Sequence, residues 1–284
     1  MEKLFAPFEP GDEGPRRRFR KIPIRALLPN LVTLLALCLG LTAIRMAIEG
    51  RMDLAVAGIV IAAILDGIDG RLARYLQAQS RFGAELDSLA DFMNFGCAPA
   101  LILFFWGLGP LQTLGWVVML IFAICAALRL ARFNVMLDDP NRPAFAGNFF
   151  VGMPAPAAAV VVLLPVYLEM LGLPRFAFSA PLYLIFALAI ALLMVSKIPT
   201  WSGKKLSARV PRDYVLPILV MVVLFVALLL SYPWQLLTLV VLAYLGTIPL
   251  AFMHYRRLEK AHVLSSGGLI MSEQEHEKRP DHLN

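Results

Sequence analysis

Four aspartates gather in one short polar stretch of an otherwise apolar sequence. They form two pairs, because Asp66 and Asp69 are three residues apart and Asp87 and Asp91 are four apart. Either spacing places both carboxylates of a pair on one face of a helix. Carboxylates brought together inside a membrane protein repel one another strongly unless cations lie between them. The stretch from Asp66 to Asp91 therefore predicts a cation site.

The types of ligand narrow the choice of cation. Carboxylate oxygens are hard ligands and no set of Cys or His accompanies them, which favours Mg²⁺, Mn²⁺ or Ca²⁺ over zinc. Protein-bound Mg²⁺ usually shares substrate phosphates, and two metal ions can clamp a phosphoryl group between them. Arg74 and Arg81 could take up the remaining phosphate charge. Gly70 and Gly83 leave room for a nucleotide to approach the backbone.

Two other interpretations of the acidic residues stay open. The aspartates could form a buried ion-pair network with Arg71, Arg74 and Arg81. They could also form the site of a divalent-cation transporter, although transporter sites usually lie near the bilayer midplane on broken helices. An ionisable residue inside a membrane span is a functional candidate by default, so we favour an active site.

The elements that must position these residues are membrane helices. The chain of 284 residues is 59% hydrophobic and 16% charged, whereas soluble domains are roughly 45–50% apolar and about 25% charged. We expect an all-α fold, a polytopic bundle of membrane helices. A spanning helix needs roughly 20 mostly apolar residues. That length predicts eight spans, near residues 28–48, 53–76, 84–106, 111–135, 150–170, 179–198, 213–231 and 234–254.

Basic residues predict the orientation of these helices. Lys and Arg cluster before the first span and in every even-numbered connection, whereas the odd-numbered connections carry little beyond Arg51 and Arg175. The positive-inside rule then places both termini on the cytoplasmic side of the inner cell membrane. The link between the second and third spans is short, so these helices are expected to be antiparallel neighbours. Their four aspartates should converge in one pocket at the cytoplasmic membrane surface.

The spacing of the whole stretch resembles the signature of the CDP-alcohol phosphatidyltransferase family. The matching residues are Asp66-x-x-Asp69-Gly70-x-x-Ala73-Arg74, then eight residues, then Gly83-x-x-x-Asp87-x-x-x-Asp91. The resemblance implies a membrane enzyme in which an alcohol attacks a CDP-linked lipid and CMP is released.

The same resemblance implies a role for each motif residue. Two divalent cations, Mg²⁺ or Mn²⁺, would be held by the four aspartates, with Asp91 shared between metal binding and general-base catalysis. The remaining motif positions would bind the CDP-lipid together with Asp66 and two polar residues of the first span. This predicted set is Asn30, Thr33, Asp66, Gly70, Ala73, Arg74 and Gly83.

Further stretches resemble the membrane-integral phosphatidylserine synthases within that family. They are residues 85–100, 128–134, 152–159 and 196–204. This resemblance implies CDP-diacylglycerol and L-serine as substrates and a homodimer as the assembly. Glycerol 3-phosphate or inositol phosphate as the acceptor stays an alternative, because basic residues near the predicted pocket could bind a phosphorylated alcohol.

Four residues are candidates for binding the acceptor. Arg129 and Arg132 are three apart near the inner end of the fourth predicted span and could clamp the carboxylate of serine. They could equally anchor lipid headgroups or bind the CDP pyrophosphate. Asn94 and Asn134 are candidate hydrogen-bond partners.

The predicted organisation has four parts. Residues 1–27 form a basic cytoplasmic segment, and residues 28–206 form the catalytic membrane domain. Residues 207–257 add C-terminal membrane helices, and residues 258–284, which are polar, form a disordered cytoplasmic tail.

Overall fold

The computed structural model describes residues 24–137, 149–176, 178–196, 198–201, 214–251 and 253. Most of the predicted basic segment and all of the predicted C-terminal tail lie outside these residues. The described part is helical apart from one short antiparallel ladder, in which β1 (Phe149–Val151) pairs with β2 (Pro199–Trp201). The predicted all-α fold class is therefore confirmed, and the ladder is an addition that the sequence did not predict.

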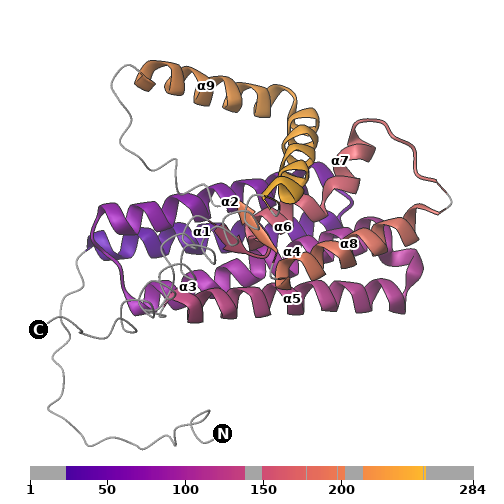
Figure 1. Cartoon of the computed structure of the whole chain (residues 1–284), viewed down its shortest axis with the longest axis horizontal. Coiled ribbons are helices and arrows are strands. Elements are labelled where there is room, and N and C mark those ends of the chain that lie inside the picture. The colour runs from indigo at the N-terminus through magenta and orange to yellow at the C-terminus, as the bar shows by residue number, and fades with distance from the viewer. Residues whose placement is uncertain are drawn as a thin grey trace, which may run out of the picture.

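The first two helices form a close antiparallel pair (Figure 1). Helix α1 spans Ile24–Ile48 and α2 spans Met52–Tyr75, joined by a turn in which Gly50 has a positive φ of 77°. Small residues let the two backbones approach. A Cβ atom on Gly58 would come within 2.9 Å of the Ala43 side chain. This packing brings the start of α1 beside the end of α2, where the acidic motif begins.

The third helical run carries the second pair of aspartates and is longer than predicted. It begins with α3 (Arg81–Asp91) and extends without interruption to Leu111, whereas the sequence predicted 84–106. Its parts after α3 are η1 (Phe92–Cys97), α4 (Ala98–Leu103), η2 (Phe104–Leu108) and η3 (Gly109–Leu111). Both η1 and η2 are π-helical, a geometry often found at functional sites. The first of these wide turns starts directly after Asp91.

Helix α5 (Thr113–Leu137) returns along the bundle and packs against α8 (Ser179–Val195). Between them lie two short helices, α6 (Ala155–Val162) and α7 (Leu164–Met170), where the sequence predicted one span over 150–170. Gly152 has a positive φ of 79°, which ends β1 and delays the start of the helix. A proline lies in the first turn of each short helix, where its missing N–H would have no partner within the helix.

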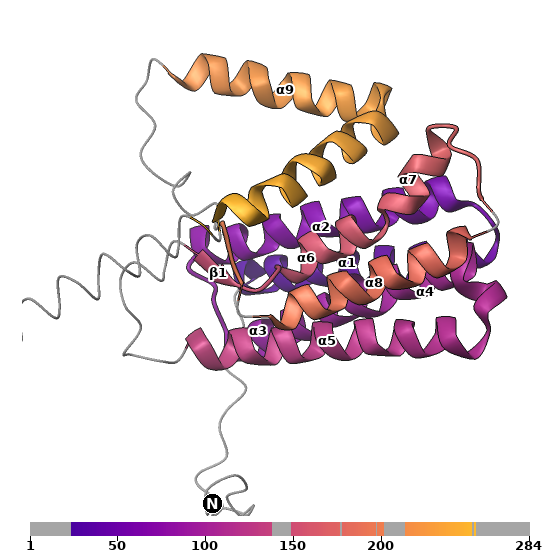
Figure 2. The same ribbon diagram turned by 45° about the vertical axis from the view of Figure 1, so that its right-hand side comes forward.

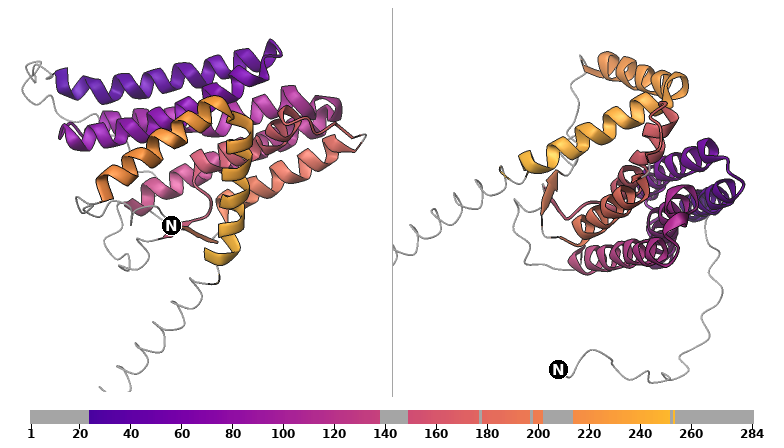
Figure 3. Two further views of the ribbon diagram at one scale, coloured as in Figure 1. Left: turned by 90° about the horizontal axis from the view of Figure 1, so that it is seen from above. Right: turned by 90° about the vertical axis from the view of Figure 1, so that its right-hand side faces the viewer.

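The hydrophobic core of the bundle lies between these helices. Its largest fully buried side chains include Phe95, Phe122 and Tyr167. The end-on view in Figure 3 shows the bundle helices gathered side by side and the C-terminal helices lying to one side of them.

The C-terminal helices form a hairpin. Helix α9 (Val215–Ser231) lies apart from the bundle and contains no buried residue (Figure 1). The helix that follows, Pro233–Ala251, returns toward the end of the bundle where β1 lies (Figure 2). Its Val241 is 1% exposed and belongs to the core.

Within the described residues, four helices are long and apolar enough to cross a membrane. They are Leu27–Ile48, Arg81–Leu111, Thr113–Met136 and Pro233–Ala251. The apolar segments Ala155–Met170, Ser179–Val195 and Val215–Ser231 are shorter. Helix α2 carries the charged motif along its last turns. The protein is a helical membrane protein, while the count of eight spans stays a prediction.

Candidate active site

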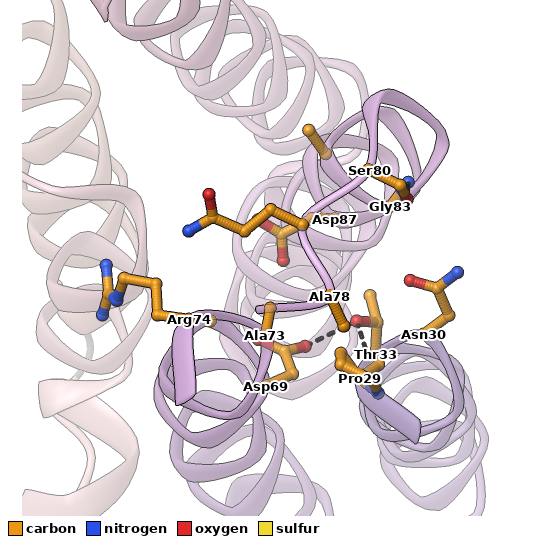
Figure 4. Close-up of a pocket in the computed structure, with 13 residues that line it drawn as sticks. Pro29, Asn30, Thr33, Asp69, Ala73, Arg74, Ala78, Ser80, Gly83 and Asp87 are labelled. Atoms are coloured by element: carbon orange, nitrogen blue, oxygen red, sulfur yellow. Dashed lines mark hydrogen bonds between the residues drawn. The ribbon is translucent and has the colours of Figure 1, made fainter. Parts of the chain in front are cut away.

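A pocket of about 300 Å³ opens where the first turns of α1, the last turns of α2 and the first turns of α3 meet (Figure 4). The start of α1, distant in sequence, joins the two neighbouring segments of α2 and α3 because α1 packs against both helices. Its lining residues are Pro29, Asn30, Thr33, Asp69, Gly70, Ala73, Arg74, Ala78, Gln79, Ser80, Gly83, Ala84 and Asp87. All members of the predicted CDP-lipid set except Asp66 are therefore brought together in one pocket.

Three of the four aspartates form a compact cluster. One carboxylate oxygen from each of Asp66, Asp69 and Asp87 lies within 4.8 Å of the other two. The three-residue spacing on α2 gives two of them a common face, and the antiparallel α3 adds the third. This donor set of hard oxygens suits a divalent cation such as Mg²⁺ or Mn²⁺. The predicted convergence of the aspartates is thus present in the fold.

Asp91 occupies a different place from the other three aspartates. Its carboxyl group lies directly beside that of Asp66, one helical turn beyond Asp87 and at the last residue of α3. It is not one of the three groups in the compact cluster. The carboxylates of Asp66, Asp69 and Asp87 therefore form the cluster, and the carboxylate of Asp91 lies next to it.

Positive charge near the aspartates comes from Arg129. The α5 arginine interacts electrostatically with Asp91 most strongly and with Asp66 less strongly. Across the described part of the chain, the ion pairs within 4.0 Å are Arg45–Glu49 and Arg175–Glu169, and neither involves the motif. The proposed network with Arg71, Arg74 and Arg81 is therefore not formed among the described residues.

A hydrogen bond fixes one member of the cluster to α1. The hydroxyl of Thr33 lies 2.7 Å from Oδ2 of Asp69 and 3.1 Å from the backbone oxygen of Pro29, and its single proton serves one of them at a time. Thr33 is 5% exposed and Asp69 is 3% exposed. Because both side chains are buried, the first helix positions the carboxylate as well as lining the pocket.

The start of α3 is held by a cap and by a close contact at Gly83. Ser80 precedes the helix, and its side-chain oxygen accepts a hydrogen bond of 3.0 Å from the backbone N–H of Gly83. A Cβ atom on Gly83 would lie 2.8 Å from Oδ1 of Asn30. Gly70 differs, since nothing lies within 4 Å of its missing side chain. Gly83 therefore permits close packing of α3 on α1, and Gly70 leaves open space in the pocket.

The four predicted acceptor-binding residues fall in four different environments, and none of them lines the pocket. Arg129 is the member that faces the aspartates. Arg132 donates a hydrogen bond of 2.8 Å to the backbone oxygen of Val195, at the end of α8. Asn134 donates one of 2.9 Å to the hydroxyl of Ser88 on α3.

Asn94 lies deeper in the bundle than its sequence position suggested. It is 1% exposed on the π-helical turn η1, and a Cβ atom on Gly40 of α1 would overlap its Oδ1. The π-helical geometry after Asp91 turns this side chain toward α1. Asn94 therefore packs between two helices, away from the pocket.

Sequence reasoning missed several residues of the pocket wall. Ala78, Gln79, Ser80 and Ala84 line it, and they occupy the link between α2 and α3 and the first turn of α3. A signal for Ser80 was present, because Ser directly before a helix is a preferred N-cap residue. The alanines and Gln79 carry no such signal.

Comparison with known proteins identifies the family. A sequence model of CDP-alcohol phosphatidyltransferases matches residues 26–198. The chain belongs to the CDP-alcohol phosphatidyltransferase family. A second model, described as CDP-alcohol phosphatidyltransferase 2, matches residues 213–249, which include α9 and most of the helix that follows it. CDP-alcohol phosphatidyltransferases generally use divalent metal ions, and the carboxylate cluster could hold one.

Several curated CDP-alcohol phosphatidyltransferases are similar over most of their length. A protein of Mycobacterium leprae is 42% identical over 247 residues, covering 87% of this chain and 81% of the relative. One from Mycobacterium tuberculosis is 43% identical over 233 residues, covering 82% and 80%. One from Helicobacter pylori is 35% identical over 216 residues, covering 75% and 85%. Each of the three is named CDP-diacylglycerol–serine O-phosphatidyltransferase.

Proposed function

We propose that the protein transfers the phosphatidyl group of CDP-diacylglycerol to the hydroxyl of L-serine, giving phosphatidylserine and CMP. The observation that carries the proposal is the pocket at the junction of α1, α2 and α3, in which the nucleotide-facing motif residues adjoin three clustered carboxylates. The choice of serine is supported by the shared name of relatives that are 35–43% identical to this chain.

Each part of the pocket has a role in this proposal. Asn30, Ala73, Arg74 and the open space at Gly70 receive the CDP group, with Arg74 close to its phosphates. Asp66, Asp69, Asp87 and Asp91 would hold two divalent cations, Mg²⁺ or Mn²⁺, and Asp66 would also contact the CDP-lipid. The cations, when bound, offset the negative charge of the pyrophosphate during transfer.

Asp91 is the residue that we assign to proton transfer. The serine oxygen forms a bond to the phosphorus that carries diacylglycerol, and the bond from that phosphorus to the oxygen of CMP breaks. Asp91 accepts the proton of the serine hydroxyl, so that CMP leaves with the electron pair of the broken bond. Its position beside the three clustered carboxylates, and outside their compact set, suits a base that is less tightly ligated than its neighbours.

The acceptor side of the site is assigned to α5. Arg129 supplies a cation to the serine carboxylate, which is the charge that distinguishes serine from a simple alcohol. Asn134, bonded to Ser88 beside Asp87, and the buried Asn94 would support this side from α5 and η1. Arg132 donates a hydrogen bond to the end of α8, so we assign it a structural role there and no contact with the acceptor.

The proposal extends to topology and assembly. Eight spans with both termini and the pocket at the cytoplasmic face of the inner membrane are supported by the distribution of Lys and Arg. Residues 28–206 would form the catalytic domain, a range close to the matched 26–198. A homodimer is supported by the family resemblance.

The decisive experiment measures CMP. Purified protein in detergent micelles receives CDP-diacylglycerol, Mg²⁺ or Mn²⁺, and one of three acceptors: L-serine, glycerol 3-phosphate or inositol phosphate. We expect CMP release that depends on serine, with phosphatidylserine as the lipid product. Release with a phosphorylated acceptor but not with serine would overturn the choice of substrate. Flux of divalent cations into vesicles without any CMP release would instead support a transporter.

A further inference from the structure

Two contacts join α1 to the third helical run, and in each an asparagine of one helix lies against a glycine of the other. A Cβ atom on Gly83 would lie 2.8 Å from Oδ1 of Asn30, a contact within the pocket wall (Figure 4). A Cβ atom on Gly40 of α1 would overlap Oδ1 of Asn94 and lie 3.0 Å from its Cγ. Both aspartates of the run lie between Gly83 and Asn94 in the sequence. The two contacts therefore hold the run against α1 on either side of these aspartates.

Helix α1 is in turn fixed to α2, which carries the other two aspartates. The hydroxyl of Thr33 lies 2.7 Å from Oδ2 of Asp69. Further along α1, Ala43 packs so closely on Gly58 that a Cβ atom on this glycine would lie 2.9 Å from the alanine side chain. Gly40 lies between Thr33 and Ala43 in α1. The contact at Gly40 therefore attaches the third run to a part of α1 that is fixed to α2 at both ends.

The contact between Asn94 and Gly40 is held by packing. The Asn94 side chain is 1% exposed, and its Oδ1 is fully buried without a hydrogen-bond partner among the described residues. A buried amide oxygen without a partner costs free energy of folding. In coiled coils, a single buried asparagine fixes the register of the helices at such a cost in stability. The fit of this branched side chain into the space beside Gly40 can fix the register of α1 and the third run in the same way.

We propose that Asn94 is a positioning residue: its side chain, seated against Gly40, fixes the third run on the α1–α2 pair and so holds Asp91 in its place. Asp91 lies three residues before Asn94 in the same continuous helical run. The inference rests on the proposed function, in which Asp91 accepts the proton of the serine hydroxyl. Asn94 does not line the pocket and acts only through Asp91. A displaced base lowers the rate of the chemical step and leaves the binding of both substrates unchanged.

The first test empties the space beside Gly40. Asn94→Ala removes the side chain beyond Cβ, and the full-length enzyme is assayed for CMP release with CDP-diacylglycerol and serine. We expect kcat to fall about tenfold, because the base is no longer held in place, while the KM values for both substrates stay unchanged. A rise in the KM for serine at constant kcat would instead make Asn94 a ligand of the acceptor and overturn the proposal.

Thr238→Val is the matched control for this substitution. Thr238 is 7% exposed on the helix Pro233–Ala251, and its hydroxyl is also fully buried without a hydrogen-bond partner among the described residues. The control therefore removes a polar atom of the same kind from a helix that carries none of the aspartates. It should leave kcat and both KM values unchanged.

The second test asks whether a methyl group can take the place of the amide. Gly40→Ala alone should lower both kcat and the thermal midpoint in detergent, because its Cβ would overlap the Asn94 side chain. In the double variant Gly40→Ala/Asn94→Ala, the nearest remaining atom at position 94 is the Cα, 3.4 Å away, which is an ordinary contact distance. We therefore expect the double variant to exceed Gly40→Ala in thermal midpoint and both single variants in kcat. Gly246→Ala is the control, since nothing lies within 4 Å of that position.

Two results from the double variant would overturn the positioning role. Recovery of the thermal midpoint without recovery of kcat would mean that the carboxamide itself takes part in the chemistry. Thermal losses that simply add would mean that the side chain is not seated against Gly40. The thermal midpoints require no turnover. A wild-type enzyme that releases no CMP with serine would therefore refute the proposed function, while the fit between Asn94 and Gly40 is still judged separately.

Discussion

The two sides of the active site are assembled from parts at very different distances along the chain. On the aspartate side, all four carboxylates come from Asp66 to Asp91, and helix periodicity together with one short link brings them together. On the arginine side, Arg129 of α5 faces Asp91 of α3, and α5 itself is held in place by α8. The first side follows from local spacing. The second depends on how remote helices pack.

The packing of remote helices also gives different neighbours to two arginines that lie close together in the sequence. Arg129 and Arg132 lie one helical turn apart on α5, yet Arg129 faces the aspartates and Arg132 is bonded to the backbone oxygen of Val195. Three residues along a helix correspond to a rotation of about 300°, so the two side chains leave the helix in directions about 60° apart. A modest angle is enough to direct one to the site and the other to α8.

The largest effect should come from removing the cation that the aspartate side is built to hold. Treatment with EDTA should reduce CMP release to background, and added Mg²⁺ or Mn²⁺ should restore it, because uncompensated carboxylates would repel the pyrophosphate. The measurement is CMP release before and after metal is restored. Turnover that persists in EDTA would show that the cluster works without a metal ion.

Asp91→Asn should be the most damaging single substitution that leaves the three clustered carboxylates in place. Loss of a general base is expected to lower kcat by about 10³-fold, with binding of CDP-diacylglycerol largely kept. Steady-state CMP release and binding of the CDP-lipid measure the two parts. Asp53→Asn, at the exposed far end of α2, makes the same chemical change away from the site and should have no effect. Full activity of the Asp91 variant would refute its assignment as the base.

The two arginines test the other side of the comparison. Arg129→Lys should raise the KM for serine about tenfold, because an ammonium lacks the forked donors of a guanidinium. Arg132→Lys should leave that KM unchanged and lower the stability by about 1 kcal/mol through the lost bond to Val195. The KM for serine from steady-state kinetics and the thermal midpoint in detergent distinguish the two variants. Equal kinetic losses would mean that both arginines serve the acceptor.

The smallest effect is expected at the contact between α1 and α3. Gly83→Ala would press a methyl group on the Asn30 side chain, whose flexible end can move, so the KM for CDP-diacylglycerol should rise about fivefold. Gly67→Ala is the control, since nothing lies within 4 Å of that position. A larger change at Gly67 than at Gly83 would contradict the assignment of Asn30 to the nucleotide side.

The sequence predicted the fold class and the pocket better than the acceptor side. The six pocket-lining residues of the CDP-lipid set come from the motif and the first span, whose positions depend on helix periodicity and a short connection. The environments of Arg132 and Asn94 could not be predicted in the same way. The environment of Arg132 depends on where α8 ends. The environment of Asn94 depends on the π-helical turn that follows Asp91.

By itself, the sequence predicted that four carboxylates would meet at one end of two antiparallel membrane helices, because a helix repeats every 3.6 residues and apolar length sets where it spans. The family resemblance already gave Asp91 a separate role, and tertiary structure alone decided which arginine faces it. Contacts from α5 to α3 and to α8 depend on the packing of whole helices, and no local spacing in the chain encodes that packing.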